Sequence, residues 1–229
     1  MAKIAFSPLI TDARKKAGSA VFSKSRTGNY VKRRVVPRQP RTTSQLAVRA
    51  DFKANSQAFR GIGQTNITGW NTLGAATTHT DRLGNKFAPS GIQLYQLANR
   101  NLSSMGQAAL NTPPANFNVD SPTGLVITAV GGGTPSMTVN PSPAPAATDY
   151  ILIYAVTPQS AGKSSNSQKA YRLIAVVIGT TTLPHSVLTA WQAKFGTLTT
   201  GTAINLGVRY GNPTNGATSG MVTTRLIAG

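Results

Sequence analysis

The residues that most often carry catalysis are few and scattered in this chain. All five acidic residues are Asp, there is no Cys or Glu, and the two His, His79 and His185, lie far apart in the sequence. Paired-carboxylate hydrolysis needs two acids in one cleft, and a metal site needs several ligands that converge. No spacing of Asp or His indicates such a group. We therefore predict that the chain is not an enzyme and has no metal or other cofactor.

A second chemistry, the binding of anions, is well represented. The stretch GNYVKRRVVPRQPRTTSQLAVRADFK covers residues 28–53 and holds seven basic residues and one acid. Cations at this density can neutralise phosphates, and an aromatic ring can stack on a base. They can equally bind an acidic protein surface. The candidate partner-binding residues are Tyr30, Lys32, Arg33, Arg34, Arg38 and Arg41.

The excess charge is concentrated near the N-terminus. The chain has 229 residues and a formal net charge of +18, and 14 of its 23 basic residues lie in residues 1–60. A charge of this size steers a protein toward polyanions or acidic partners. The favoured interpretation is anchoring to an acidic protein by charge and strand pairing. Nucleic-acid binding is the second interpretation, and a solvated tail is the third.

Two other patterns carry less weight. The run Gly131-Gly132-Gly133-Thr134 has no Lys in the position of a phosphate-binding loop, so a turn is expected. No apolar run is long enough for a membrane span, and the N-terminal residues lack the features of a signal peptide. We expect no membrane partner.

The N-terminal segments that carry the cations have distinct local patterns. Residues 1–41 are expected to form an extended basic arm, with a hairpin between 21–25 and 29–36. Pro37 and Pro40 oppose a helix. Residues 42–110 are expected to form a small helical unit with helices at 42–60, 65–77 and 91–105. Thr42 with Gln45 fits a capping box, and Ser90 is a candidate cap for the third helix.

All three helices have an apolar face that can be assigned from spacing, and that of the third holds Ile92, Tyr95, Leu97 or Ala98, and Leu102. On the first, Val48, Phe52 and Phe59 recur at helical spacing. On the second, Ile67, Trp70 and Leu73 lie roughly on one side. Gly69 and Gly74 within the second helix weaken its pattern.

The C-terminal half has the pattern of a β-protein. A linker rich in Pro and Asn is expected at 111–122, followed by a β-domain at 123–229. Strands are predicted at 125–130, 136–140, 149–156, 170–179, 203–211 and 221–228. Short strands at this spacing favour an antiparallel sandwich. The predicted fold class is therefore α+β multidomain: an arm, a helical unit and an antiparallel β-sandwich.

Two resemblances follow from specific stretches. SPTGLVITA, DYILIYAV and AINLGVRYGNPTNGATSG resemble a fibronectin type III or immunoglobulin-like sandwich. The stretch from TDARKKAGSAVF through GNYVKRRVVPRQPRTTSQ to DRLGNKFAPSGIQLYQLANRNL resembles uncharacterised proteins encoded by bacteriophages and prophages. Its matches are Gly18, Phe22, Gly28-Asn29-Tyr30, Pro40-Arg41-Thr42 and Gln45, whereas Phe59 stands where family members often have Trp.

The second resemblance implies a structural role in a virion. The expected function is a capsid-associated minor or decoration protein that cements or caps the shell and is anchored by its basic arm. It implies other virion proteins as partners, multiple copies or a homo-oligomer, location in the virion and assembly in the host cytoplasm. The alternatives are a nucleic-acid-binding or packaging protein of the virion and a tail or receptor-binding module.

Overall fold

The chain forms two compact units, Met1–Ala47 and Val48–Gly229. The computed structural model describes residues 2–3, 15–25, 28–35, 41–80, 86–163 and 170–229. The boundary between the units falls inside the first helix, six residues after the expected end of the arm. The expected helical unit, linker and β-domain all contribute to the second unit. Whether 42–110 and 123–229 fold independently remains a prediction.

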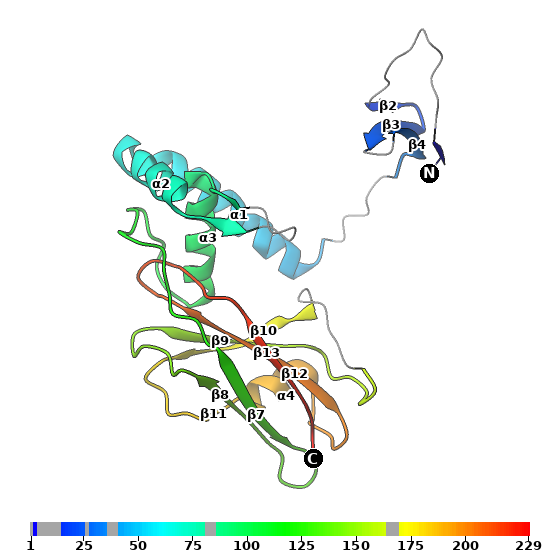
Figure 1. Cartoon of the computed structure of the whole chain (residues 1–229), viewed down its shortest axis with the longest axis vertical. Coiled ribbons are helices and arrows are strands. Elements are labelled where there is room, and N and C mark those ends of the chain that lie inside the picture. Colours follow the sequence, from blue (N-terminus) through cyan, green and yellow to red (C-terminus); the bar gives the residue numbers. More distant parts are fainter. Residues whose placement is uncertain (1, 4–14, 26–27, 36–40, 81–85, 164–169) are drawn as a thin grey trace. The chain divides into compact units, whose positions relative to one another are not determined.

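The N-terminal unit is built around a small antiparallel sheet. Its strands are β1 (Ala2–Lys3), β2 (Lys15–Ala17), β3 (Ala20–Ser25) and β4 (Gly28–Arg33), in the order β1-β4-β3-β2 (Figure 1). Strands β3 and β4 pair from Ala20 with Arg33 to Ser25 with Gly28, which confirms the predicted hairpin. The second strand ends at Arg33, three residues before its predicted end.

Three helices follow, close to their predicted bounds. They are α1 (Thr43–Gly61), α2 (Gln64–Ala76) and α3 (Gly91–Ser104). The Gln45 N–H donates to Thr42 Oγ1 at 3.3 Å, and the Ser90 N–H donates to Gln93 Oε1 at 2.9 Å. These bonds satisfy backbone or side-chain groups at helix starts that would otherwise lack partners. The cap signals in the sequence therefore mark both helix starts correctly.

The helices bury one apolar cluster, but α1 contributes little to it. The cluster contains Phe59, Trp70, Leu94, Tyr95 and Ala98. The Trp70 and Tyr95 rings meet edge to face with centroids 5.4 Å apart, a favourable aromatic geometry. The predicted apolar face of α1 is wrong at Val48 and Phe52, which are 47% and 61% exposed. Only the C-terminal end of that face is buried.

The glycines inside α2 are explained by close packing. A Cβ on Gly69 would come within 2.6 Å of Pro113 Cγ, and a Cβ on Gly74 would come within 2.6 Å of the Pro89 carbonyl oxygen. Any side chain at these positions would therefore force the neighbouring segments apart. Packing offsets the low helix propensity of glycine, so the helix forms despite it.

The C-terminal strands form two antiparallel sheets. Their bounds are β7 (Gly124–Val130), β8 (Ser136–Ser142), β9 (Tyr150–Ala155), β10 (Arg172–Ile178), β11 (His185–Ser186), β12 (Ala203–Gly211) and β13 (Val222–Ile227). One sheet has the order β10-β9-β12-β13 and the other β11-β8-β7. All six predicted strands are present, and β11 was not predicted. A short pair, β5 (His79–Thr80) with β6 (Lys86–Phe87), lies before α3.

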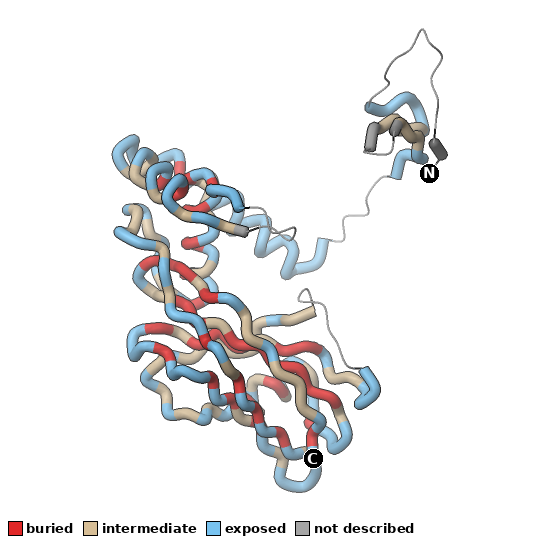
Figure 2. The backbone as a smooth tube through the Cα atoms, in the orientation of Figure 1, coloured by how far each residue is buried: buried red, intermediate tan, exposed pale blue. Residues whose placement is uncertain are grey.

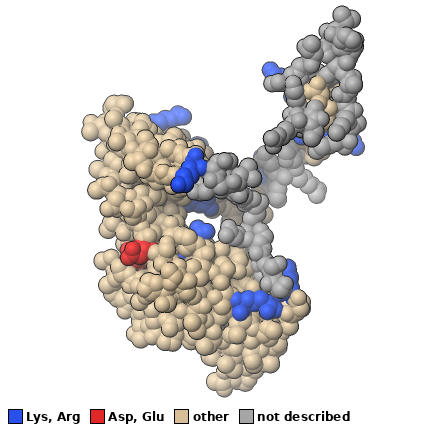
Figure 3. Space-filling view, viewed as in Figure 1, with Lys and Arg blue, Asp and Glu red and all other residues tan. Residues whose placement is uncertain are grey.

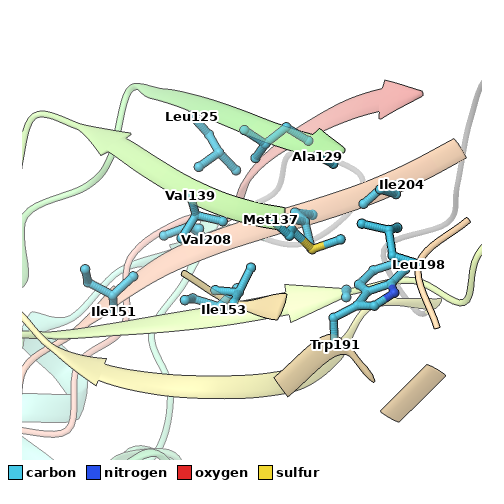
Figure 4. Close-up of a cluster of buried hydrophobic side chains, with 14 of the residues drawn as sticks. Leu125, Ala129, Met137, Val139, Ile151, Ile153, Trp191, Leu198, Ile204 and Val208 are labelled. Atoms are coloured by element: carbon cyan, nitrogen blue, oxygen red, sulfur yellow. The ribbon is translucent and has the colours of Figure 1, made fainter. Parts of the chain in front are cut away.

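The two sheets share one hydrophobic core (Figure 4). On β7 and β8, buried and exposed residues alternate, so Leu125, Ile127, Met137 and Val139 face this core. The helix α4 (Leu188–Phe195) adds the fully buried Trp191. The fold is therefore mixed α+β, and its antiparallel sheets are compatible with the predicted β-sandwich.

The other face of the four-stranded sheet packs against α3. Leu102 and Met105, at the end of α3, form a second buried cluster with Leu152 of β9. Strands β9 and β12 are consequently buried along almost their whole length (Figure 2). Helices and sheets thus form one continuous packed unit.

The segment 111–122 is packed rather than extended between two bodies. The Trp70 indole N–H donates to the Asn111 carbonyl at 2.9 Å, and the Asn215 amide donates to the Asn118 carbonyl at 2.9 Å. Each end of the segment is thereby tied to a different element. Among the helices in the described ranges, none combines the length and apolar character needed to cross a bilayer.

Candidate functional site

The predicted basic residues are divided between the two faces of the N-terminal sheet. Tyr30 lies opposite Ser23, and Lys32 lies opposite Val21. Because side chains two positions apart on a strand share a face, Tyr30 and Lys32 lie on the same face. Arg33 lies opposite Ala20 and therefore belongs to the other face. From the sequence these residues were grouped as one candidate set, whereas the pleat of the strand places them on two faces.

The remaining candidates lie outside the strands. Arg34 follows β4, and its backbone N–H donates to the Ser19 carbonyl at 2.7 Å. Arg41 is exposed just before α1. Arg38 lies outside the described residues. Of the six candidates, the sheet therefore brings together Tyr30 and Lys32, with Arg33 on the reverse face.

A further cation joins this surface through the sheet register. Lys16 of β2 pairs with Val21, which in turn pairs with Lys32, so the three residues form one row across the face. Lys16 and Lys32 are both exposed. The row was missed because β2 is only three residues long and has no clear strand pattern. We call Lys16, Tyr30 and Lys32 the basic face.

Cations in the C-terminal unit have different surroundings, because two of them contact their own chain. The Arg209 guanidinium carbon lies 5.7 Å from the centre of the Tyr154 ring. The Arg225 guanidinium donates to the carbonyls of Ala161 and Lys163. On the view in Figure 3, basic side chains of this unit are scattered and most of the surface is uncharged. These arginines have structural partners within the described ranges.

Two carboxylates come closer in space than the sequence suggested. Asp149, 5% exposed, directly precedes β9. Its burial first, and the Asp120 charge second, raise its pKa above the ordinary value. Because the folded pKa is raised, the stability that Asp149 contributes in acid is lost as the pH rises through that pKa. In the described ranges no third acid or His joins this pair, because no group of three or more potential metal ligands occurs there.

The two His are in short strands. His79 belongs to β5 and His185 to β11. The His79 ring lies beside Phe87 with centroids 6.0 Å apart, and its buried Nε2 has no hydrogen-bond partner. The pairing of β11 with β8 places His185 opposite Val139. The structure does not bring the two His together.

One hollow in the C-terminal unit is a polar cleft of about 530 Å³. We call it the polar cleft. Three segments line it: the end of α2 with 77–79, the segment 115–121, and the turn 217–220 between β12 and β13. Among the residues that the structure describes, no Lys, Arg, Asp or Glu contributes to its lining. No sequence pattern indicates this cleft, because its walls come from segments that are distant along the chain.

A smaller hollow of about 240 Å³ lies between α1 and α3. Val48, Phe52 and Leu97 supply its apolar surface, and Asp51 and Arg100 are among its polar residues.

Comparison of the chain with protein-family models, with curated proteins and with solved structures found no match.

Proposed function

We propose that this chain is a structural protein of a bacteriophage virion, associated with the capsid as a minor or decoration protein. The observation that carries the proposal is the basic face, where Lys16, Lys32 and Tyr30 are presented by a hydrogen-bonded sheet. The resemblance of the N-terminal sequence to phage-encoded proteins supplies the setting. The basic face supplies the means of attachment.

The charge balance of the N-terminal unit favours an external acidic partner. Residues 1–47 contain 11 basic residues and a single acid, Asp12. Internal ion pairs can therefore neutralise only one of these charges. Exposed cations are screened over about 8 Å at physiological salt. A close array of carboxylates would compensate these charges directly at contact.

An acidic protein is favoured over nucleic acid as that partner. Among the described residues, Tyr30 is the only aromatic residue on the basic face, and stacking platforms for single strands use successive aromatic rings. A small sheet with an edge strand can also extend a partner's sheet through its backbone. The proposed mechanism is mechanical: charge and strand pairing hold the N-terminal unit to the shell.

The C-terminal unit is the part that would cap the shell or project from it. Its two sheets, with orders β10-β9-β12-β13 and β11-β8-β7, hold seven strands between them. Seven antiparallel strands divided between two sheets are typical of fibronectin type III and immunoglobulin-like sandwiches. We include this fold type in the proposal. In Figure 4 the side chains of both sheets point into a common core.

The test removes the charge without changing the sheet. In the triple variant Lys16→Gln, Lys32→Gln, Arg34→Gln, the chain is expected to be lost from purified particles. In the matched control Lys163→Gln, Arg172→Gln, Lys194→Gln, three exposed cations of the C-terminal unit are removed, and retention is expected. Chain content is measured by quantitative mass spectrometry of sedimented particles.

The outcomes discriminate between the two partners. Retention of the triple variant at the level of the control would contradict anchoring by charge. Nucleic acid would be the partner if the triple variant loses duplex DNA binding, and if nuclease treatment of opened particles releases the unmodified chain.

A further inference from the structure

The polar cleft combines a size and a composition that fit a small neutral ligand. Its lining includes the side chains of Thr77, Thr78, Asn116, Asn118 and Ser121. Hydroxyl and carboxamide groups both donate and accept hydrogen bonds. Apolar residues complete the lining, among them Leu73, Phe117 and Val119. Such a mixture can contact both the hydroxyl groups and the C–H faces of a sugar ring.

Several of these polar groups are available to a ligand. Within the described ranges, the side chains of Thr78, Asn118 and Ser121 form no hydrogen bond. The buried His79 Nε2, also in the lining, has no partner either. A buried polar atom without a partner costs free energy. A ligand hydroxyl in the cleft would remove that cost.

The walls of the cleft are fixed by hydrogen bonds before any ligand arrives. The Asn215 amide donates to the Asn118 carbonyl at 2.9 Å, and the Asn215 Oδ1 accepts the Ala217 N–H at 2.8 Å. The Ser219 Oγ accepts the Tyr210 N–H at 2.9 Å. These bonds join the segment 115–121 to the turn after β12. A preformed site loses less conformational entropy on binding.

The absence of charge in the lining selects the class of ligand. None of the basic residues in the described ranges lines the cleft. Phosphates and carboxylates are normally held by Arg, Lys or helix N-termini, and α2 meets the cleft at its C-terminal end. We propose that the polar cleft binds a neutral mono- or disaccharide unit. This site is separate from the basic face, so its activity does not rest on the proposed attachment.

Saturation-transfer NMR on the full chain tests this site. The probes are the methyl glycosides of glucose, galactose, mannose, rhamnose, N-acetylglucosamine and N-acetylgalactosamine, with glucuronate and N-acetylneuraminate as charged comparators. At least one neutral glycoside is expected to receive saturation, and more than either charged sugar. No transfer to any neutral glycoside, or stronger transfer to a charged sugar, would overturn the proposal.

Matched variants assign the signal to the cleft. The double variant Thr78→Val, Asn118→Ala is expected to weaken binding about tenfold, since two hydrogen bonds to the ligand are lost. The control Thr134→Val, Asn140→Ala changes exposed residues outside the cleft and is expected to bind normally. Equal binding by the double variant and the control would overturn the assignment. A second cleft variant, Ser121→Ala, keeps the test valid if the double variant fails to fold.

The same measurement separates this inference from the proposed function. The triple variant Lys16→Gln, Lys32→Gln, Arg34→Gln is expected to bind the glycoside normally. Loss of binding in that variant would show that the sugar is held by the N-terminal unit and would overturn the cleft assignment. Retained binding would support the cleft, whether or not the variant remains on particles.

Discussion

Two tryptophans are fully buried, and they differ in what their indole N–H groups meet. Trp70 donates to the Asn111 carbonyl at 2.9 Å. The Trp191 N–H has no hydrogen-bond partner, although its ring packs against Phe195 with centroids 4.8 Å apart. An unpaired buried donor costs free energy, whereas a paired one stabilises the fold.

Replacing each tryptophan by phenylalanine should therefore give unequal losses of stability. Trp70→Phe is expected to cost about 1 kcal/mol more than Trp191→Phe, because it also breaks a hydrogen bond. Both changes remove a similar apolar volume, so each variant controls for the other. Urea unfolding gives the two free energies of unfolding. Equal losses, or a larger loss for Trp191→Phe, would contradict the hydrogen-bond assignment.

Among the elements, the turn between β12 and β13 depends on a contact with α3. Gly216 has a φ of +72°, and a Cβ there would come within 2.5 Å of the Ala98 carbonyl oxygen. The Asn101 amide of α3 also donates to the Gly216 carbonyl at 2.8 Å. Only glycine accommodates both the backbone conformation and the close approach.

Gly216→Ala is therefore expected to destabilise the C-terminal unit by about 1–3 kcal/mol, through strain and overpacking. Gly220→Ala is the control, because a Cβ at Gly220 would have no atom within 4 Å and its φ lies outside the left-handed region. The control should change stability by less than about 0.5 kcal/mol. Thermal unfolding compares the two variants. A Gly216→Ala variant as stable as the control would show that the turn does not need glycine.

The elements that were predictable from sequence are those with strong local signals. Apolar residues run almost continuously along strand 124–130, and they alternate with other residues along most of strand 203–211. The structure places both strands within one residue of the prediction. Thr42 and Ser90 marked helix starts through local side-chain chemistry. In each case the information lies within a few residues, so tertiary structure adds little.

Features that depend on contacts between distant segments were not predictable. Phe52 has the spacing of a core residue, but it is 61% exposed. Gly74 has a low helix propensity, and its position is explained only by the close approach of the Pro89 carbonyl oxygen. Asp120 and Asp149, and the walls of the polar cleft, are brought near one another only by the fold. The division of Lys32 and Arg33 between two faces required the strand register.

At the scale of the whole molecule, the N-terminal unit has the higher density of basic residues, and the uncharged cleft lies in the C-terminal unit. The N-terminal unit carries 11 of the 23 basic residues in 47 positions. The C-terminal unit holds the large shared core and an uncharged cleft. Attachment through charge and recognition through neutral hydrogen bonding can therefore operate in separate parts of the chain, and salt should weaken only the first.

The most direct test of the central claim is a cryo-EM map of particles that contain this chain, traced through residues 15–35. We expect Lys16, Lys32 and Arg34 to lie within ion-pairing distance of Asp or Glu side chains of a shell protein. Phosphate density of the genome against the same side chains would contradict protein anchoring. That result would instead identify the N-terminal sheet as a genome-binding element.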